Sequence, residues 1–90
     1  MAKINLPQPL IRLLDGDGVP DIDASTVGEL FSKLIGRYPS LEKRLMKEDG
    51  EFNRFVNIYL NEEDIRFLNG KNTILKNTDE ITVVPSVAGG

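Results

Sequence analysis

Cysteine and histidine are both absent from this sequence. Without cysteine the chain has no disulfide, no thiolate nucleophile and no cysteine metal site. Without histidine it lacks the side chain that most often transfers protons near pH 7 and binds transition metals. We therefore predict that the chain is not an enzyme by itself, and that it binds no metal and no cofactor of its own.

Clustered positive charge and long apolar runs are also missing. Eleven Lys and Arg residues are scattered along the chain against 14 Asp and Glu residues, which gives a net charge of −3. Because nucleic-acid phosphates require clustered Lys and Arg, we expect no nucleic-acid partner. No apolar run is long enough to cross a bilayer, and the first residues lack the apolar core of a secretory signal. We expect a cytoplasmic protein without membrane association.

What remains is one small domain of ordinary composition. The chain has 90 residues, of which 40% are hydrophobic and 28% charged. These values are typical of soluble globular proteins. A chain of this length buries only about 60 to 65% of the surface that its unfolded form exposes. A deep, enclosed active site is therefore not expected.

Short extended segments begin the chain. Residues 2–6 and 10–14 are largely apolar and are separated by prolines, which predicts two strands. The turn-forming run Asp15-Gly16-Asp17-Gly18 follows. Its two aspartates do not predict a calcium loop, because Pro20 stands where that loop needs glycine and Thr26 where it needs glutamate. A plain turn is expected instead.

The clearest helix in the sequence begins at Thr26, because Glu29 follows three positions later and completes a capping box. Tyr38-Pro39 ends it, since the residue before proline is pushed away from helical angles. Residues 40–46 are expected to add one or two further turns with their leucines facing inward. Apolar residues recur at helical spacing and predict one buried stripe: Val27, Leu30, Phe31, Leu34 and Ile35.

The second half of the chain predicts strands. Residues 54–60 carry the strongest signal, and the turn 61–64 would let residues 65–67 pair back as a hairpin. The β-branched run 80–84 predicts a last strand that leaves the sheet near Pro85. The two faces of the first of these strands are expected to carry Val56, Ile58 and Leu60 on one side, and Phe55, Asn57 and Tyr59 on the other. This order predicts an α+β fold, with a mixed sheet of four to five strands and one main helix on one face.

The end of the chain, Pro85-Ser86-Val87-Ala88-Gly89-Gly90, carries the chemistry. Five residues can extend about 16 to 18 Å, enough to bring a terminal carboxylate into another protein's active site, and glycine leaves a narrow channel unobstructed. A partner enzyme with ATP can convert that carboxylate into an acyl adenylate, and a sulfur donor can then displace AMP to leave a thiocarboxylate. We expect a domain over residues 1–85 and a flexible tail over 86–90. The expected tail residues are Val87, Ala88 and Gly89 for recognition and Gly90 for chemistry.

A family resemblance extends over the whole chain. The strand, helix and strand order, the segment Leu60-Asn61-Glu62-Glu63-Asp64-Ile65 and the ending from Asp79 to Gly90 resemble the MoaD/ThiS sulfur carriers of the ubiquitin-like β-grasp group. Residues 54–67 look like the CysO-type branch, which supplies sulfur for cysteine biosynthesis. The chain departs from this pattern at Asn77-Thr78, where relatives commonly turn with Asp-Gly, and this leaves the turn type open.

The resemblance implies a β-grasp fold and a set of partners. An E1-like adenylating enzyme that uses ATP and magnesium would activate the carboxylate of Gly90, and a downstream synthase would accept the sulfur. Exposed aromatic residues on a sheet face often mark an interaction site. We therefore expect Phe55, Tyr59 and Val84 to form the partner surface, unless residues 68–75 or a second copy of the chain cover them.

Other functions remain open for the same ending. A ubiquitin-like modifier would use the adenylated Gly90 to form an isopeptide bond with lysines of target proteins. A plain interaction module would carry its glycines only as a frayed end. Among sulfur carriers, the acceptor pathway can be cysteine, molybdopterin, thiamin, a methionine precursor or tRNA thiolation.

Overall fold

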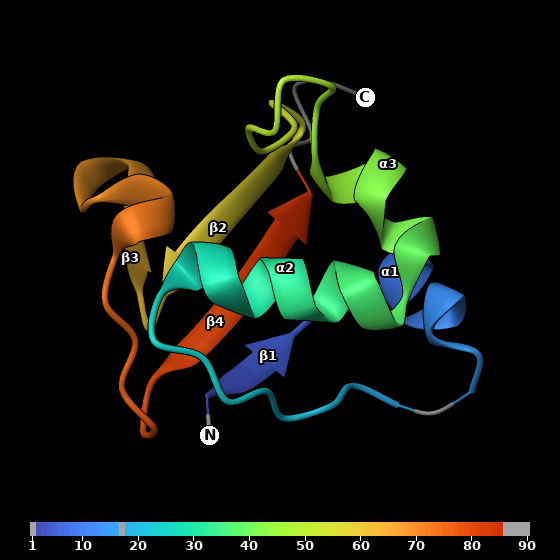
Figure 1. Cartoon of the computed structure of the whole chain (residues 1–90), viewed down its shortest axis with the longest axis horizontal. Helices are drawn as coiled ribbons and strands as arrows, with labels where there is room; N and C mark the ends of the chain where they lie inside the picture. Colours follow the sequence, from blue (N-terminus) through green and yellow to red (C-terminus); the bar gives the residue numbers. More distant parts are fainter. Residues whose placement is uncertain (1, 17, 86–90) are drawn as a thin grey trace.

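The computed structural model describes residues 2–16 and 18–85 and has two layers (Figure 1). One layer is a four-stranded sheet in the order β1-β4-β2-β3. Its strands are β1 (Lys3–Asn5), β2 (Val56–Leu60), β3 (Glu63–Asp64) and β4 (Glu80–Pro85). β1 pairs with β4 in parallel, whereas β2 pairs antiparallel with both β4 and β3. The helices cover one face of this sheet, so the predicted α+β architecture is confirmed.

The main helix, α2 (Val27–Arg37), begins at the predicted N-cap. The Thr26 hydroxyl accepts a hydrogen bond from the backbone N–H of Glu29 at 3.1 Å. The Glu29 carboxylate accepts one from the backbone N–H of Ser25 at 2.6 Å, one residue earlier than in the usual capping box. The helix ends before Tyr38-Pro39, as predicted. The local cap at Thr26 and the proline after Tyr38 therefore mark the two ends of α2, and a longer-range hydrogen bond from the Val27 N–H to the Thr73 carbonyl at 3.0 Å adds to the N-terminal end.

Residues 10–14 are helical, and the predicted second strand is wrong. α1 (Gln8–Ile11) is followed by a 3-10 helix, η1 (Arg12–Leu14). Pro7 is the N-cap of α1 and Pro9 lies in its first turn, where a fixed φ favours a helix and the missing N–H has no intrahelical partner to lose. Leu10 and Leu14 are buried by this turn. The sequence pattern predicts that Pro7 and Pro9 separate two strands, but in the structure they start a helix.

Two further turns follow α2 as predicted. The 3-10 helix η2 (Pro39–Leu41) continues into α3 (Glu42–Leu45). Leu41 and Leu45 are completely buried. Phe52, in the loop after α3, packs its ring edge against Phe31 of α2, with centroids 5.1 Å apart and an interplanar angle of 78°. This loop therefore belongs to the core on its inner side.

The predicted hairpin after β2 exists, but its return strand lies earlier than predicted. Asn61 takes a positive φ of 58° and turns the chain. Glu63 and Asp64 then pair with Leu60 and Tyr59. Residues 65–67 leave the sheet as a 3-10 helix, η3 (Ile65–Phe67), because the Asp64 carboxylate accepts the backbone N–H of Arg66 at 2.9 Å and caps that turn. A second 3-10 helix, η4 (Gly70–Asn72), follows.

The turn before β4 needs no positive backbone angle. Asp79 donates its backbone N–H to the Lys76 carbonyl at 3.0 Å, and its carboxylate accepts the Lys76 N–H at 2.8 Å. Among the described residues other than glycine, only Asp15 and Asn61 have positive φ. Asn77-Thr78 therefore turns with ordinary angles, and the side-chain hydrogen bond of Asp79 supports the turn without a glycine.

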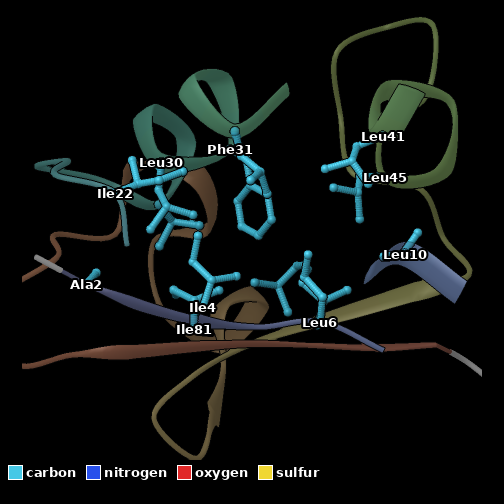
Figure 2. Packing of buried hydrophobic residues seen from close by; sticks show 14 of the residues in the cluster. Ala2, Ile4, Leu6, Leu10, Ile22, Leu30, Phe31, Leu41, Leu45 and Ile81 are labelled. Atoms are coloured by element: carbon cyan, nitrogen blue, oxygen red, sulfur yellow. The ribbon is translucent and has the colours of Figure 1, made fainter. Parts of the chain in front are cut away.

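The core lies between α2 and the inner face of the sheet. In Figure 2, Leu30 and Phe31 of α2 point toward Ile4 of β1 and Ile81 of β4. Ile58 of β2 is 3% exposed, while Val56 and Leu60 are partly buried against the same cluster. The predicted stripe and the predicted inner strand face therefore meet. None of the described helices is long and apolar enough to cross a membrane.

Candidate functional site

The central strand β4 carries the chain toward its end. Pro85, the last residue of β4, lies opposite Val56, the first residue of β2. β4 therefore ends at the side of the sheet where β2 begins (Figure 1). The predicted tail residues Val87, Ala88, Gly89 and Gly90 lie outside the described residues. Their roles stay predictions.

The predicted partner surface lies on the face of the sheet opposite the helices. Val84 pairs with Asn57, and Thr82 pairs with Tyr59, and directly paired residues share a face. Their neighbours Ile58 and Val83 are buried on the inner face. Tyr59 and Val84 therefore point outward together, and Val84 is 38% exposed.

Phe55 lies just before β2 and is 48% exposed. Its backbone N–H donates to the Asn53 side chain at 3.0 Å, which fixes the turn into the strand. One alternative was that residues 68–75 cover this surface. Instead η4 packs on α2, close enough that a Cβ at Gly28 would stand 3.1 Å from the Lys71 carbonyl oxygen. Binding of a partner at Phe55, Tyr59 and Val84 stays a prediction.

A charged cluster, which sequence reasoning missed, adjoins Tyr59. Asp64 pairs with Tyr59 across the hairpin and is only 8% exposed. Its carboxylate accepts Nη2 of Arg66 at 2.6 Å and Nε of Arg66 at 3.1 Å. Nη2 of Arg66 also donates to Oδ1 of Asn57 at 3.2 Å. The signal in the sequence was the Asp-x-Arg spacing after the hairpin turn, because Asp64 as the N-cap of η3 accepts the backbone N–H of Arg66 and can also reach its side chain.

The electrostatics of this cluster follow from that geometry. The hydrogen bond from Arg66 holds the pKa of the Asp64 carboxyl below its ordinary value of 3.8, although burial acts in the opposite direction. The same hydrogen bond raises the pKa of the Arg66 guanidinium, and the Tyr59 phenol adds to that effect. Asp64 and Arg66 are therefore both charged at neutral pH.

The other half of the outer face is polar and paired. The Asn5 side chain donates to the carboxylate of Glu80 and to the Thr82 hydroxyl. Asn61 accepts the backbone N–H of Glu80 at 3.1 Å and donates to Asp79 at 3.3 Å. The apolar part of this face is consequently confined to the side of the sheet where β4 ends at Pro85.

The helical side carries an open groove of about 1010 Å³ between α2 and the segment 42–52. Phe31, Ile35 and Phe52 line it, with lysines at its rim. Among the described residues, no cluster of acidic side chains is arranged to hold a metal ion. The lining also includes Glu42, Glu48 and Ser32, and no hydrogen bond among the described residues joins these three side chains to one another.

Comparison with known proteins identifies the family. The family model described as ThiS family matches residues 10–90. The sulfur carrier protein CysO of Mycobacterium tuberculosis is 36% identical over 91 residues, covering 99% of this chain and 98% of its own. Small archaeal modifier protein 3 of Haloferax volcanii is 40% identical over 68 residues, covering 76% of this chain and 73% of its own.

A solved structure supports the same assignment. CysO in the Amycolatopsis orientalis BexX/CysO complex superimposes with a TM-score of 0.86 at 32% identity, and the match covers 100% of both chains. The fold is therefore the ubiquitin-like β-grasp that sequence reasoning predicted, and the relatives are small carriers and modifiers rather than catalysts. The chain belongs to the ThiS family.

Proposed function

We propose that this protein is a sulfur carrier whose working group is the carboxylate of Gly90. The observation that carries the proposal is the ending Ser86-Val87-Ala88-Gly89-Gly90, which follows the central strand β4 in the sequence of a chain with no cysteine or histidine. The likeness to CysO over 99% of the chain supports it. Because no side chain can carry a persulfide, sulfur would travel on the main-chain terminus.

The chemistry proceeds in two steps on a partner enzyme. The Gly90 carboxylate attacks the α-phosphate of ATP, which forms an acyl–phosphate bond and releases pyrophosphate. A sulfide equivalent from a donor then attacks the carbonyl carbon, the bond to AMP breaks, and the thiocarboxylate remains. The ATP and magnesium belong to the E1-like adenylating enzyme, and this chain itself contributes the tail and the docking surface.

The docking surface is the exposed end of the sheet formed by Phe55, Tyr59 and Val84. This surface lies beside Pro85. An enzyme bound there could therefore bind residues 86–90 in its active site without contacting the rest of the domain. A downstream synthase would then accept the sulfur, and the likeness to CysO favours cysteine biosynthesis in the cytoplasm.

A ubiquitin-like modifier is the second candidate function. The 40% identity to a small archaeal modifier protein supports it, because activation of the terminal carboxylate precedes conjugation as well. In that case the acyl adenylate would pass to a lysine amine of a target protein, with formation of an isopeptide bond.

Intact mass spectrometry of the protein from its native cells tests both functions. A carrier shows replacement of one terminal oxygen by sulfur, an increase of about 16 Da. A modifier instead leaves a branched remnant that ends in Gly89-Gly90 on lysines of other proteins, and after tryptic digestion this remnant comprises residues 77–90, because Lys76 is the last tryptic site. An unmodified terminus in sulfur-demanding growth, with no remnants on other proteins, would contradict both.

A further inference from the structure

Among the described residues, Arg66 is the one cation beside the outer sheet face that other side chains hold in place. Its side chain is 69% exposed, yet Asp64 and Asn57 both accept hydrogen bonds from it. These bonds use Nε and Nη2. Nη1 makes no hydrogen bond with the described residues, so its two N–H groups are available to a bound partner.

The position of this guanidinium matters because it extends the docking surface. Asn57 lies beside Val84 in the sheet register and Asp64 beside Tyr59, so their common partner Arg66 adjoins both apolar residues. Arginine and tyrosine are enriched among the residues that dominate binding energy at protein interfaces. A side chain already fixed in its bound conformation also loses less entropy when a partner binds.

We propose that Arg66 is a specificity-determining residue of the docking surface and that it binds a carboxylate of the adenylating enzyme through Nη1. Asp64 and Asn57 are the positioning residues that aim the guanidinium. This inference rests on the proposed function, since it names the partner group that the same surface recognises.

The charge of the outer face favours a single carboxylate, and not a polyanion, as the group that Arg66 binds. The charged residues on the outer face are Lys3, Glu80, Asp64 and Arg66, which sum to zero, and the whole chain carries −3. A polyanion gains nothing from such a face. The fork of Nε and Nη2 is occupied by Asp64 and Asn57, so an Asp or Glu oxygen of the partner would accept from Nη1. The ammonium of a lysine has no planar set of donors that could bind Asp64, Asn57 and a partner in this arrangement.

The test is ATP–pyrophosphate exchange by the adenylating enzyme at increasing concentrations of this protein. Arg66→Lys keeps the charge beside Asp64 but removes the planar fork, so KM for the carrier should rise about tenfold while kcat stays within about twofold. Asn57→Ala loosens the guanidinium and should raise KM about threefold. Arg44→Lys, on α3 and exposed on the helical side, is the matched control and should leave KM unchanged.

Two results would overturn the inference: a KM for Arg66→Lys equal to that of the wild type, or a loss of kcat at constant KM. If Arg66→Lys melts below the assay temperature, the KM of Asn57→Ala decides. If even the wild type supports no exchange, the proposed function fails. Titration of the enzyme with the same variants, without ATP, then decides the role of Arg66 separately by their relative affinities.

Discussion

At the scale of single residues, the proposed chemistry depends on the exact length of the chain. Deleting Gly90 moves the terminal carboxylate back by about 3.3 to 3.6 Å, and misplacement by about 1 Å can cost a hundredfold in rate. We therefore expect ATP–pyrophosphate exchange to disappear in the shortened protein. Adding one residue should have the same effect unless a protease trims it. Exchange at the wild-type rate without Gly90 would refute the central proposal.

Asp64 gives the protein a defined response to acid. Its folded-state pKa lies below the ordinary value of 3.8, so the unfolded chain binds the proton more tightly. The stabilisation is fully present above that ordinary value and is lost as the pH falls through the folded-state pKa. Urea unfolding at pH 5 and pH 3 should show a smaller loss of stability on acidification in Asp64→Asn than in the wild type.

Asp49 is the matched control for this experiment. Its pKa is also lowered, chiefly by the backbone N–H of Glu51, but the carboxylate lies at the surface. Solvent screens such a group, and Asp49→Asn should leave the acid response close to that of the wild type. Equal responses of the two variants would show that the ion pair between the buried Asp64 and the exposed Arg66 does not govern acid stability.

At the scale of elements, the Thr26 side chain is one of the groups that stabilise the N-terminus of α2. The Thr26 hydroxyl satisfies the Glu29 N–H, and removal of such a cap costs about 1 kcal/mol. Thr26→Ala should lower the free energy of unfolding by that amount, measured by urea denaturation, whereas Thr26→Ser should preserve it. A loss in Thr26→Ser as large as in Thr26→Ala would mean that the methyl group, not the hydroxyl, stabilises this end.

The contact between α2 and the sheet is the main source of stability. Leu30 is completely buried and Ile58 is 3% exposed. Truncation of either to alanine should cost about 2 to 5 kcal/mol, a large share of the stability of a small domain. Thermal melting of both variants checks this expectation, with Ile74→Ala as the control, because Ile74 is 64% exposed. Melting like the wild type in both core variants would contradict the core assignment.

At the scale of the whole molecule, the helices pack on one face of the sheet to form the core, and we propose that the opposite face binds a partner. Tyr59→Ala should weaken binding to the adenylating enzyme in a titration while the variant keeps a cooperative melting transition. Ile74→Ala again serves as the control, because it truncates an exposed apolar side chain in the segment that pairs with Thr26 at the start of α2. Unchanged affinity in a well-folded Tyr59→Ala variant would remove Tyr59 from the partner surface.

The sequence by itself determined the features that depend on neighbouring residues. The Thr26 cap, the buried stripe of α2, the stop before Pro39 and the alternation along β2 all arise from local hydrogen bonds and from the helical or strand period. The sequence alone also shows the Gly-Gly ending and the absence of cysteine and histidine. The proposed chemistry rests on these features.

Only the tertiary structure decided the rest. Residues 10–14 are apolar enough for a strand or a helix, and the proline-started turn that buries Leu10 and Leu14 against the core selected the helix. The end of β3 depended on whether Asp64 would continue the ladder or cap η3. The meeting of Asn57 with Arg66 joins residues from β2 and η3, and no local pattern encodes a contact that forms only when the hairpin folds back.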